Sequence, residues 1–175
     1  MESTQRNVLG EIALGAVAGA AATWLMGKAT SYLYEQEGEA ARQREDQARG
    51  GKTAYETAAE KVAGLACQPL SDDERKKMGS AIHWSIGIGS GVLYALLRRR
   101  LAGQGVGREL AAGALFGTAV WLLLDEVGNA ALGLTPGSKA FPWQTHARGL
   151  AGHLVLGLGA EGLLQAADAA ARRVA

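Results

Sequence analysis

The sequence has little cysteine, proline or aromatic content, and no excess of charge of either sign. Its single cysteine, Cys67, excludes an internal disulfide and a metal site built from clustered cysteines. We expect Cys67 to be a small buried side chain. With 18 Lys and Arg against 17 Asp and Glu, the net charge is only +1, so the composition does not indicate nucleic-acid binding.

Motifs of catalytic sites are also missing. The chain has no HExxH, no Walker loop and no CxxC, and the serines near His83 lie outside any nucleophile-elbow pattern. Asp125 and Glu126 are adjacent, so on an α-helix their side chains point about 100° apart and do not form a ready-made acid/base pair. The sequence therefore predicts no enzyme.

Strongly hydrophobic runs are scarce as well, since the mean hydropathy of the chain is only +0.01. Four segments are nevertheless apolar enough to cross a bilayer, which takes roughly 20 residues. They cover about 8–34, 79–97, 108–132 and 147–168. Most of the 25 glycines fall in these runs, where membrane helices tolerate them better than water-soluble helices do. The sequence predicts an all-α integral membrane four-helix bundle forming one domain, 1–175; the alternative is a soluble Ala/Gly-rich helical bundle.

A polar helical connection, residues 35–78, joins the first two spans. Its early part is expected to extend the first helix as far as a hinge at Gly50-Gly51. Thr53 and Glu56 then make a capping-box pattern before apolar residues at helical spacing, which predicts a short amphipathic helix on the bundle or the lipid surface. Ser71, followed by three acidic residues, is the expected N-cap of the next helix.

Two matching phrases indicate an internal duplication. AIHWSIGIGSG from Ala81 and AGHLVLGLGAE from Ala151 both read His-x3-Gly-x-Gly, and GAVAGAAATW from Gly15 matches GALFGTAVWL from Gly113. We therefore expect two tandem helical hairpin units related by pseudo-twofold symmetry, with chance similarity as the alternative. The short glycine-rich turn at 102–107 also predicts a tight hairpin between spans two and three.

Within each span, small and ionisable residues recur every four positions and so share one face. Small residues favour helix contacts in lipid, and ionisable residues favour the interior, because a charge facing hydrocarbon costs at least about 2.5 to 3.5 kcal/mol. The predicted packing residues are Gly15, Gly19, Gly87, Gly91, Gly113, Gly117 and Gly157. The predicted polar site contains His83, His153, Asp125, Glu126, His146 and Glu161, with Glu161 deeper than the histidines.

Several roles fit this polar site. A histidine pair with acidic neighbours could titrate between about pH 5 and 8, which would suit proton or ion handling. It could instead bind a divalent metal through His83, His153 and Asp125, or ligate haem between two helices. A further alternative is interhelical hydrogen bonding in a structural or partner-binding subunit. The default expectation is no cofactor, and the expected partners are the lipid bilayer and further copies of the chain.

Four phrases carry a resemblance to a known family: GAVAGAAATW, PLSDDERKKMGSAIHW running into GSGVLYALLRRR, FGTAVWLLLDEVGNAALGL, and FPWQTHARGLAGHLVLG. In these phrases the chain resembles the YagU-like family of small bacterial inner-membrane proteins. The resemblance implies a multi-pass protein of the bacterial inner membrane with a link to acid tolerance, and it offers no catalytic residues to carry over. We expect both termini inside, on the side of the arginines at 98–100 and 172–173.

Overall fold

The structure is a computed structural model that describes residues 8–101 and 105–174, apart from the side chains of residues 99–101. Over that part of the chain it contains helices and no strand. The elements are α1 (Val8–Gln36), α2 (Glu39–Arg49), α3 (Ala54–Leu65), α4 (Asp72–Leu101), α5 (Val106–Val120), the π-helix η1 (Trp121–Gly128), α6 (Asn129–Ala131), the short 3-10 helix η2 (Ser138–Ala140) and α7 (Trp143–Val174). The predicted all-α class is confirmed.

Four helical segments are long and apolar enough to cross a membrane: Val8–Gln36, Asp72–Arg98, Val106–Ala131 and Trp143–Val174. Large apolar side chains on their outer faces are exposed, including Leu115 at 70% and Val17 at 68%. Apolar surface of this extent suits contact with lipid rather than with water. The chain therefore has the architecture of a multi-pass membrane protein, and the predicted four-helix bundle is confirmed.

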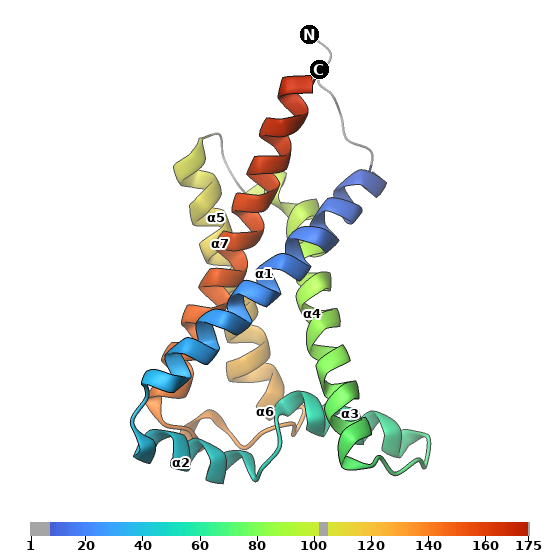
Figure 1. The fold of residues 1–175 in the computed structure, drawn as a ribbon, viewed down its shortest axis with the longest axis vertical. Coiled ribbons are helices and arrows are strands. Elements are labelled where there is room, and N and C mark those ends of the chain that lie inside the picture. The colour runs from blue at the N-terminus through green and yellow to red at the C-terminus, as the bar shows by residue number, and fades with distance from the viewer. Residues whose placement is uncertain (1–7, 102–104, 175) are drawn as a thin grey trace.

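The long helices alternate in direction, as Figure 1 shows. The first residues of α1 and the last residues of α7 lie at one end of the bundle, while α2 and α3 cross the opposite end. Helix α1 packs against both α4 and α7, and α5 packs against α7. The bundle thus contains the helix pairs α1–α4 and α5–α7, and the contact between α1 and α7, which is more extensive than that between α5 and α7, joins them.

The pairs α1–α4 and α5–α7 combine the same spans as the two predicted hairpin units. The expectation that spans two and three form a tight hairpin is wrong, because α4 contacts α5 far less than it contacts α1. The packing glycines of α4 face α1, so close approach occurs there instead. Residues 102–104 of the expected turn lie outside the described part of the chain.

Glycines set the close approach within each helix pair. A Cβ added to Gly19 would lie 2.8 Å from the carbonyl oxygen of Gly87, and one added to Gly113 would lie 2.8 Å from that of Gly157. All seven of the predicted packing glycines are buried against another helix. Both pairs thus bring helix backbones together at glycine, while the internal duplication itself stays a prediction.

The connection between α1 and α3 departs from the prediction in its first part. We expected an extension of the first helix, but α1 ends at Gln36 and α2 is a separate helix. Gly38 adopts an extended conformation (φ −64°, ψ 148°) that interrupts the helical backbone. The expected hinge lies where α2 ends, at Gly50 and Gly51, whose φ values of 60° and 79° favour glycine.

The predicted amphipathic helix is α3, and it packs on α4. Its capping box is present, because Thr53 Oγ1 accepts from Glu56 N at 3.2 Å and Thr53 N donates to Glu56 Oε2 at 2.7 Å. Burial opposes ionisation of Glu56, but the hydrogen bond from the Thr53 backbone outweighs it and holds the pKa of Glu56 below its ordinary value. The start of α3 is therefore fixed by local hydrogen bonds.

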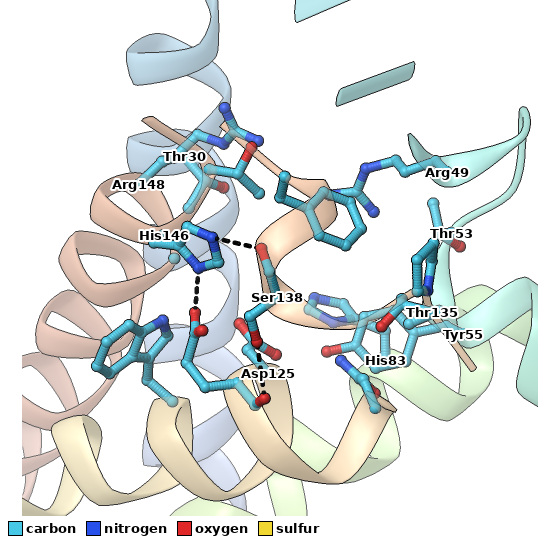
Figure 2. A pocket seen from close by; sticks show the side chains of 18 of the residues that line it. Thr30, Arg49, Thr53, Tyr55, His83, Asp125, Thr135, Ser138, His146 and Arg148 are labelled. Atoms are coloured by element: carbon cyan, nitrogen blue, oxygen red, sulfur yellow. Dashed lines mark hydrogen bonds and ion pairs between the residues drawn. The ribbon is translucent and has the colours of Figure 1, made fainter. Parts of the chain in front are cut away.

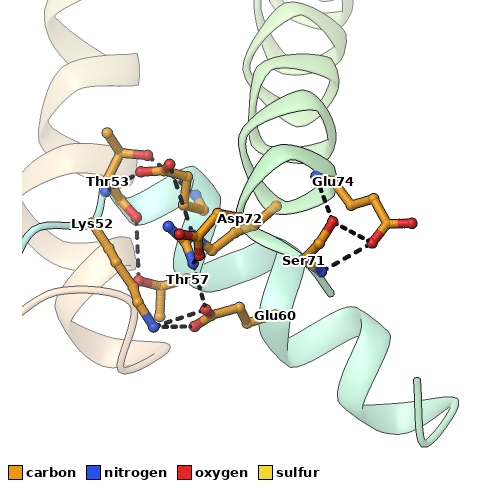
Figure 3. A network of polar contacts seen from close by, with 9 residues as sticks. Lys52, Thr53, Thr57, Glu60, Ser71, Asp72 and Glu74 are labelled. Carbon is orange, nitrogen blue, oxygen red and sulfur yellow. Dashed lines mark hydrogen bonds and ion pairs between the residues drawn. The ribbon is translucent and has the colours of Figure 1, made fainter. Parts of the chain in front are cut away.

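Polar contacts dock α3 on the first turn of α4 (Figure 3). Arg75 of α4 lies 2.6 Å from Asp72 Oδ1 and 3.6 Å from Glu60 Oε1, and Lys52 donates to Glu60 at 2.7 Å. Ser71 caps α4 as predicted, since Glu74 N donates to Ser71 Oγ at 3.4 Å and the Glu74 carboxylate accepts from Ser71 N at 2.9 Å. These contacts hold α3 across the end of the bundle.

The expectation that Cys67 is buried is wrong, because its side chain is exposed. Cys67 follows the end of α3 with a φ of 54°, the left-handed conformation that often terminates a helix. Gln68 N donates to Ala63 O at 3.1 Å and closes this turn. Cys67 therefore belongs to the exposed turn after α3 rather than to the bundle core.

Candidate functional site

A cavity of about 330 Å³ lies at the end of the bundle where α2 and α3 cross it, and we call it the polar cavity. Figure 2 shows its walls, which come from α1, α2, α3, α4, η1, α6, the start of α7 and the segment between α6 and α7. Its titratable side chains are Arg49, Tyr55, His83, Asp125, Glu126, His146 and Arg148. The cavity therefore gathers both charge signs and two of the three histidines.

Asp125 and Glu126 both line the polar cavity, and both belong to the π-helix η1. A π-helix closes i to i+5 hydrogen bonds, so each residue turns through a smaller angle than in an α-helix, and such turns are frequent at functional sites. The wider turn also puts Trp121 on the cavity wall. Both carboxylates line one cavity, and the expectation that they form no ready-made acid/base pair stays a prediction.

His146 contacts an acceptor through each of its ring nitrogens. Its Nδ1 lies 2.6 Å from Glu126 Oε1, and its Nε2 lies 3.1 Å from the carbonyl oxygen of Ser138. Ser138 also donates its hydroxyl to the carbonyl oxygen of Glu126 at 3.0 Å. Glu126 of η1, Ser138 of η2 and His146 of α7 therefore form one closed hydrogen-bonded group.

His153 lies one helical turn beyond Gly149 and points toward Asp125. Its Nδ1 donates to Gly149 O at 2.9 Å and lies 3.7 Å from Asp125 Oδ2. His83 and His153 both line a second cavity of about 10 Å³ next to Thr23 and Ser90. That volume is close to the minimum for one water molecule, so the two histidines border one small space.

His83 also packs against the first turn of α3. Its ring lies 4.9 Å from the ring of Tyr55, centroid to centroid, and the planes are tilted by 58°. Burial raises the pKa of Tyr55 to about 12, and the negative charge of Asp125 adds to this effect. The Tyr55 phenol therefore stays neutral at physiological pH.

Glu161 is the one predicted site residue that the structure places elsewhere. It is fully buried and accepts hydrogen bonds from Tyr94 at 2.7 Å and from Arg98 at 2.9 and 3.1 Å. Gln165 donates to the same carboxylate at 3.0 Å, and Arg98 reaches Asp168 at 2.7 Å. This second polar cluster ties α4 to α7 toward the end of the bundle where α7 finishes.

A group of charges around Glu45 lies beside the polar cavity, and sequence reasoning missed it. Glu45 of α2 is only 2% exposed and accepts from Arg49 at 2.6 Å, from Arg148 at 2.5 Å and from Thr145 at 2.8 Å. Arg148 also forms an ion pair with Glu37. Burial opposes ionisation of Glu45, but the hydrogen bond from Arg148 and the other contacts outweigh it and lower its pKa.

The sequence offered little signal for the Glu45 group. Glu45 lies in a run of both charge signs, which is typical of a solvated helix, and Arg148 lies at the start of the last span. Neither position reveals that α2 turns back against α7. The chain changes direction at Gly38, whose extended backbone separates α1 from α2.

The geometry gives limited support to a bound divalent metal or to haem. Among the described residues, no three His, Cys, Asp or Glu side chains come together in a way that could hold a metal ion. The space that His83 and His153 share is about 10 Å³, far below the volume of a porphyrin. Haem ligation by this pair would therefore need the helices to move apart.

Comparison of the chain with models of protein families, with curated proteins and with solved structures gave no match. The resemblance to the YagU-like family therefore stays a prediction. The function has to be argued from the geometry of the polar cavity.

Proposed function

We propose that this chain is a multi-pass protein of the bacterial cytoplasmic membrane whose polar cavity takes up and releases protons as the external conditions change. The proposal extends to ion handling during acid or envelope stress. The observation that carries it is the position of His146 between two hydrogen-bond acceptors.

A neutral imidazole has one N–H group and one lone pair. The carbonyl oxygen of Ser138 can only accept a hydrogen bond, so the proton of that contact belongs to His146 Nε2. The contact of 2.6 Å between His146 Nδ1 and Glu126 Oε1 then needs a second proton, held by either partner. The pair therefore holds one proton more than a neutral histidine beside an ionised glutamate.

Loss of that proton would disrupt the geometry. The one N–H left on a neutral imidazole can serve only one of the two acceptors, so either the contact to Glu126 or the contact to Ser138 would open. Either opening would affect Ser138, because it bonds to both residues. Proton binding at this pair is thus coupled to the position of the segment that connects α6 to α7.

Further polar groups extend from the polar cavity into the bundle. The small space beside His83 and His153 also contacts the hydroxyl residues Thr23 and Ser90. Ser90 lies four residues before Tyr94, which puts both on one face of α4, and Tyr94 donates to the buried Glu161. This series of groups that can donate and accept protons supports a role in moving protons as well as binding them.

The surroundings of the protein are part of the proposal. The exposed apolar side chains of the four long helices suit contact with lipid, so the bilayer is the proposed partner. Placement of the termini inside rests on the arginines at helix ends. Assembly into a homo-oligomer stays a prediction.

Proton flux in vesicles reconstituted with the purified chain tests the proposal over about pH 5 to 8, the range in which histidine normally titrates. We expect flux above that of empty vesicles, and a loss of flux in E126Q and in H146Q. The control is D73N, which makes the same carboxylate-to-amide change at an exposed position on the first turn of α4. Wild-type flux equal to that of empty vesicles, or unchanged flux in both cavity variants, would contradict the proposal.

A further inference from the structure

We propose that the polar cavity is also a binding site for a small organic ammonium ion, whose positive charge is held by the carboxylate of Asp125. This inference goes beyond the proposed function, because the ligand binds at Asp125 and the cavity walls; it rests on that function only for the proton that Glu126 and His146 share. It assigns a chemical class of ligand to a space that protons alone do not need.

The first support is the size and position of the space. A volume of about 330 Å³ lies at the lower end of the range found for small-molecule sites. A proton or a bare metal ion needs no such room. Helices α2 and α3 cross this end of the bundle, so a ligand there would be partly enclosed.

The second support is the state of the Asp125 carboxylate. Within the described part of the chain it accepts no hydrogen bond, and its nearest charged partner is His153 Nδ1 at 3.7 Å. That Nδ1 already donates to Gly149 O at 2.9 Å, so a neutral His153 is sufficient there. In Figure 2 Asp125 lies between His146 and the pair formed by His83 and Tyr55.

The other charges of the cavity are matched. Arg148 is paired with Glu37 and Glu45, and Arg49 is paired with Glu45. Those two arginines and two glutamates cancel in formal charge. Glu126 and His146 share a proton and are together neutral. Asp125 therefore carries a negative charge that no other described side chain of the cavity balances. This charge favours binding of a cation.

The walls indicate which kind of cation. Tyr55, Trp121 and Phe141 line the cavity, and aromatic rings attract ammonium groups through their negative faces. Burial and the charge of Asp125 raise the pKa of Tyr55 to about 12, so its ring stays neutral. Metal ions need several ligands, and no three suitable side chains of the described chain converge. A carboxylate among aromatic rings matches an organic ammonium ion better.

Protons should compete with this ligand. A proton on Asp125 or on His153 removes the uncompensated negative charge, so acid should weaken cation binding. The titratable or charged side chains that line the polar cavity with Asp125, or the small cavity beside it, are Arg49, Tyr55, His83, Glu126, His146, Arg148 and His153. Binding should therefore be stronger at about pH 8 than at about pH 5, across the range where histidines normally titrate.

Calorimetric titration of the purified full chain in detergent, with tetramethylammonium as the probe, tests the site. We expect saturable binding at about pH 8, weaker binding at about pH 5 and no detectable binding to D125N. D73N should bind like wild type. Neopentyl alcohol, a neutral molecule of similar shape, should not bind, and sodium ions should not displace the probe.

Each of these binding measurements can overturn the inference. Absence of wild-type binding, equal binding by D125N, or equal binding of neopentyl alcohol would exclude a charge-dependent site at Asp125. Displacement by sodium at equal concentration would exclude selection for organic ions. Y55L gives a second readout in case D125N does not fold, because loss of one ring should weaken binding several-fold. Proton flux measured on the same samples separates failure of this site from failure of the proposed function.

Discussion

Arg98 of α4 donates two hydrogen bonds to the fully buried carboxylate of Glu161 of α7. Its Nη2 lies 2.9 Å from Oε1, and its Nε lies 3.1 Å from Oε2. The two residues lie on helices that contact each other little, since α4 packs mainly on α1, and α7 packs on both α1 and α5. The contact therefore links the two pairs directly. It also provides hydrogen bonds for a charge that would otherwise be costly inside the bundle.

Removal of Arg98 alone should strongly destabilise the bundle. R98M leaves Glu161 buried without its cation, and loss of one partner of a buried pair typically costs about 3 to 5 kcal/mol. The free energy of unfolding in detergent measures this loss. The triple variant R98M/Y94F/E161M removes the charge together with the Tyr94 hydroxyl that donates to it, and should recover most of the stability. A triple variant as unstable as R98M would contradict this account.

Two glycines on α4 provide a matched test of helix packing. A Cβ on Gly91 would collide with the backbone of Gly19 and Gly15, whereas a Cβ on Gly89 would meet nothing within 4 Å. We expect G91A to lower the free energy of unfolding by about 1 to 3 kcal/mol through overpacking. G89A should be neutral or slightly stabilising, because alanine is the better helix former. Equal effects of the two substitutions would show that close packing at Gly91 contributes little.

The helices were predictable because each carries a strong local signal. Apolar length identified the four spans, the Thr53–Glu56 pattern identified the start of α3, and Ser71 identified the start of α4. Spacing by four residues also placed Gly19 and Gly87 on faces that do meet. These features depend on periodicity and capping, which the sequence shows directly.

The composition of the polar cavity was only partly predictable, because it depends on how distant segments fold back. Nothing local indicates the π-helical turn that aims Asp125 and Glu126 into one space. Glu45 and Arg148 lie 103 residues apart and meet only because α2 turns back against α7. Glu161 shares a helical face with His153 but lies two turns away, close enough to Arg98 to join another cluster.

The capping box of α3 should contribute measurable stability. T53A removes the hydroxyl that accepts from Glu56 N at 3.2 Å, and loss of such a cap typically costs about 1 kcal/mol. The pKa of Glu56 should rise only part of the way toward its ordinary value, because T53A removes the smaller contribution of the Thr53 side chain and keeps the larger one of its backbone N–H. Carbon-detected NMR of the Glu56 carboxyl group measures this shift. T57A is the control, since Thr57 donates only to a backbone carbonyl; an equal shift in T57A would argue against the cap.

Docking of α2 should depend on pH through Glu45. Arg148, Arg49 and Thr145 stabilise the ionised carboxylate, so the pKa of Glu45 is lower with α2 docked than with α2 free. This contribution is therefore fully present above the ordinary pKa of about 4.5 and is lost as pH falls through the lower value of the docked state. Acid should release α2 from the end of the polar cavity.

Hydrogen exchange of residues 39–49, corrected for the intrinsic effect of pH on exchange, measures this release. Wild type should show strong protection at neutral pH and a loss of protection in acid. E45Q should show weak protection at every pH, because a neutral amide cannot pair with both Arg49 and Arg148. The control is E39Q, at the exposed first residue of α2, which should behave like wild type. If E45Q kept the pH dependence of wild type, another group would control docking, and the Glu126–His146 pair would be the next to test.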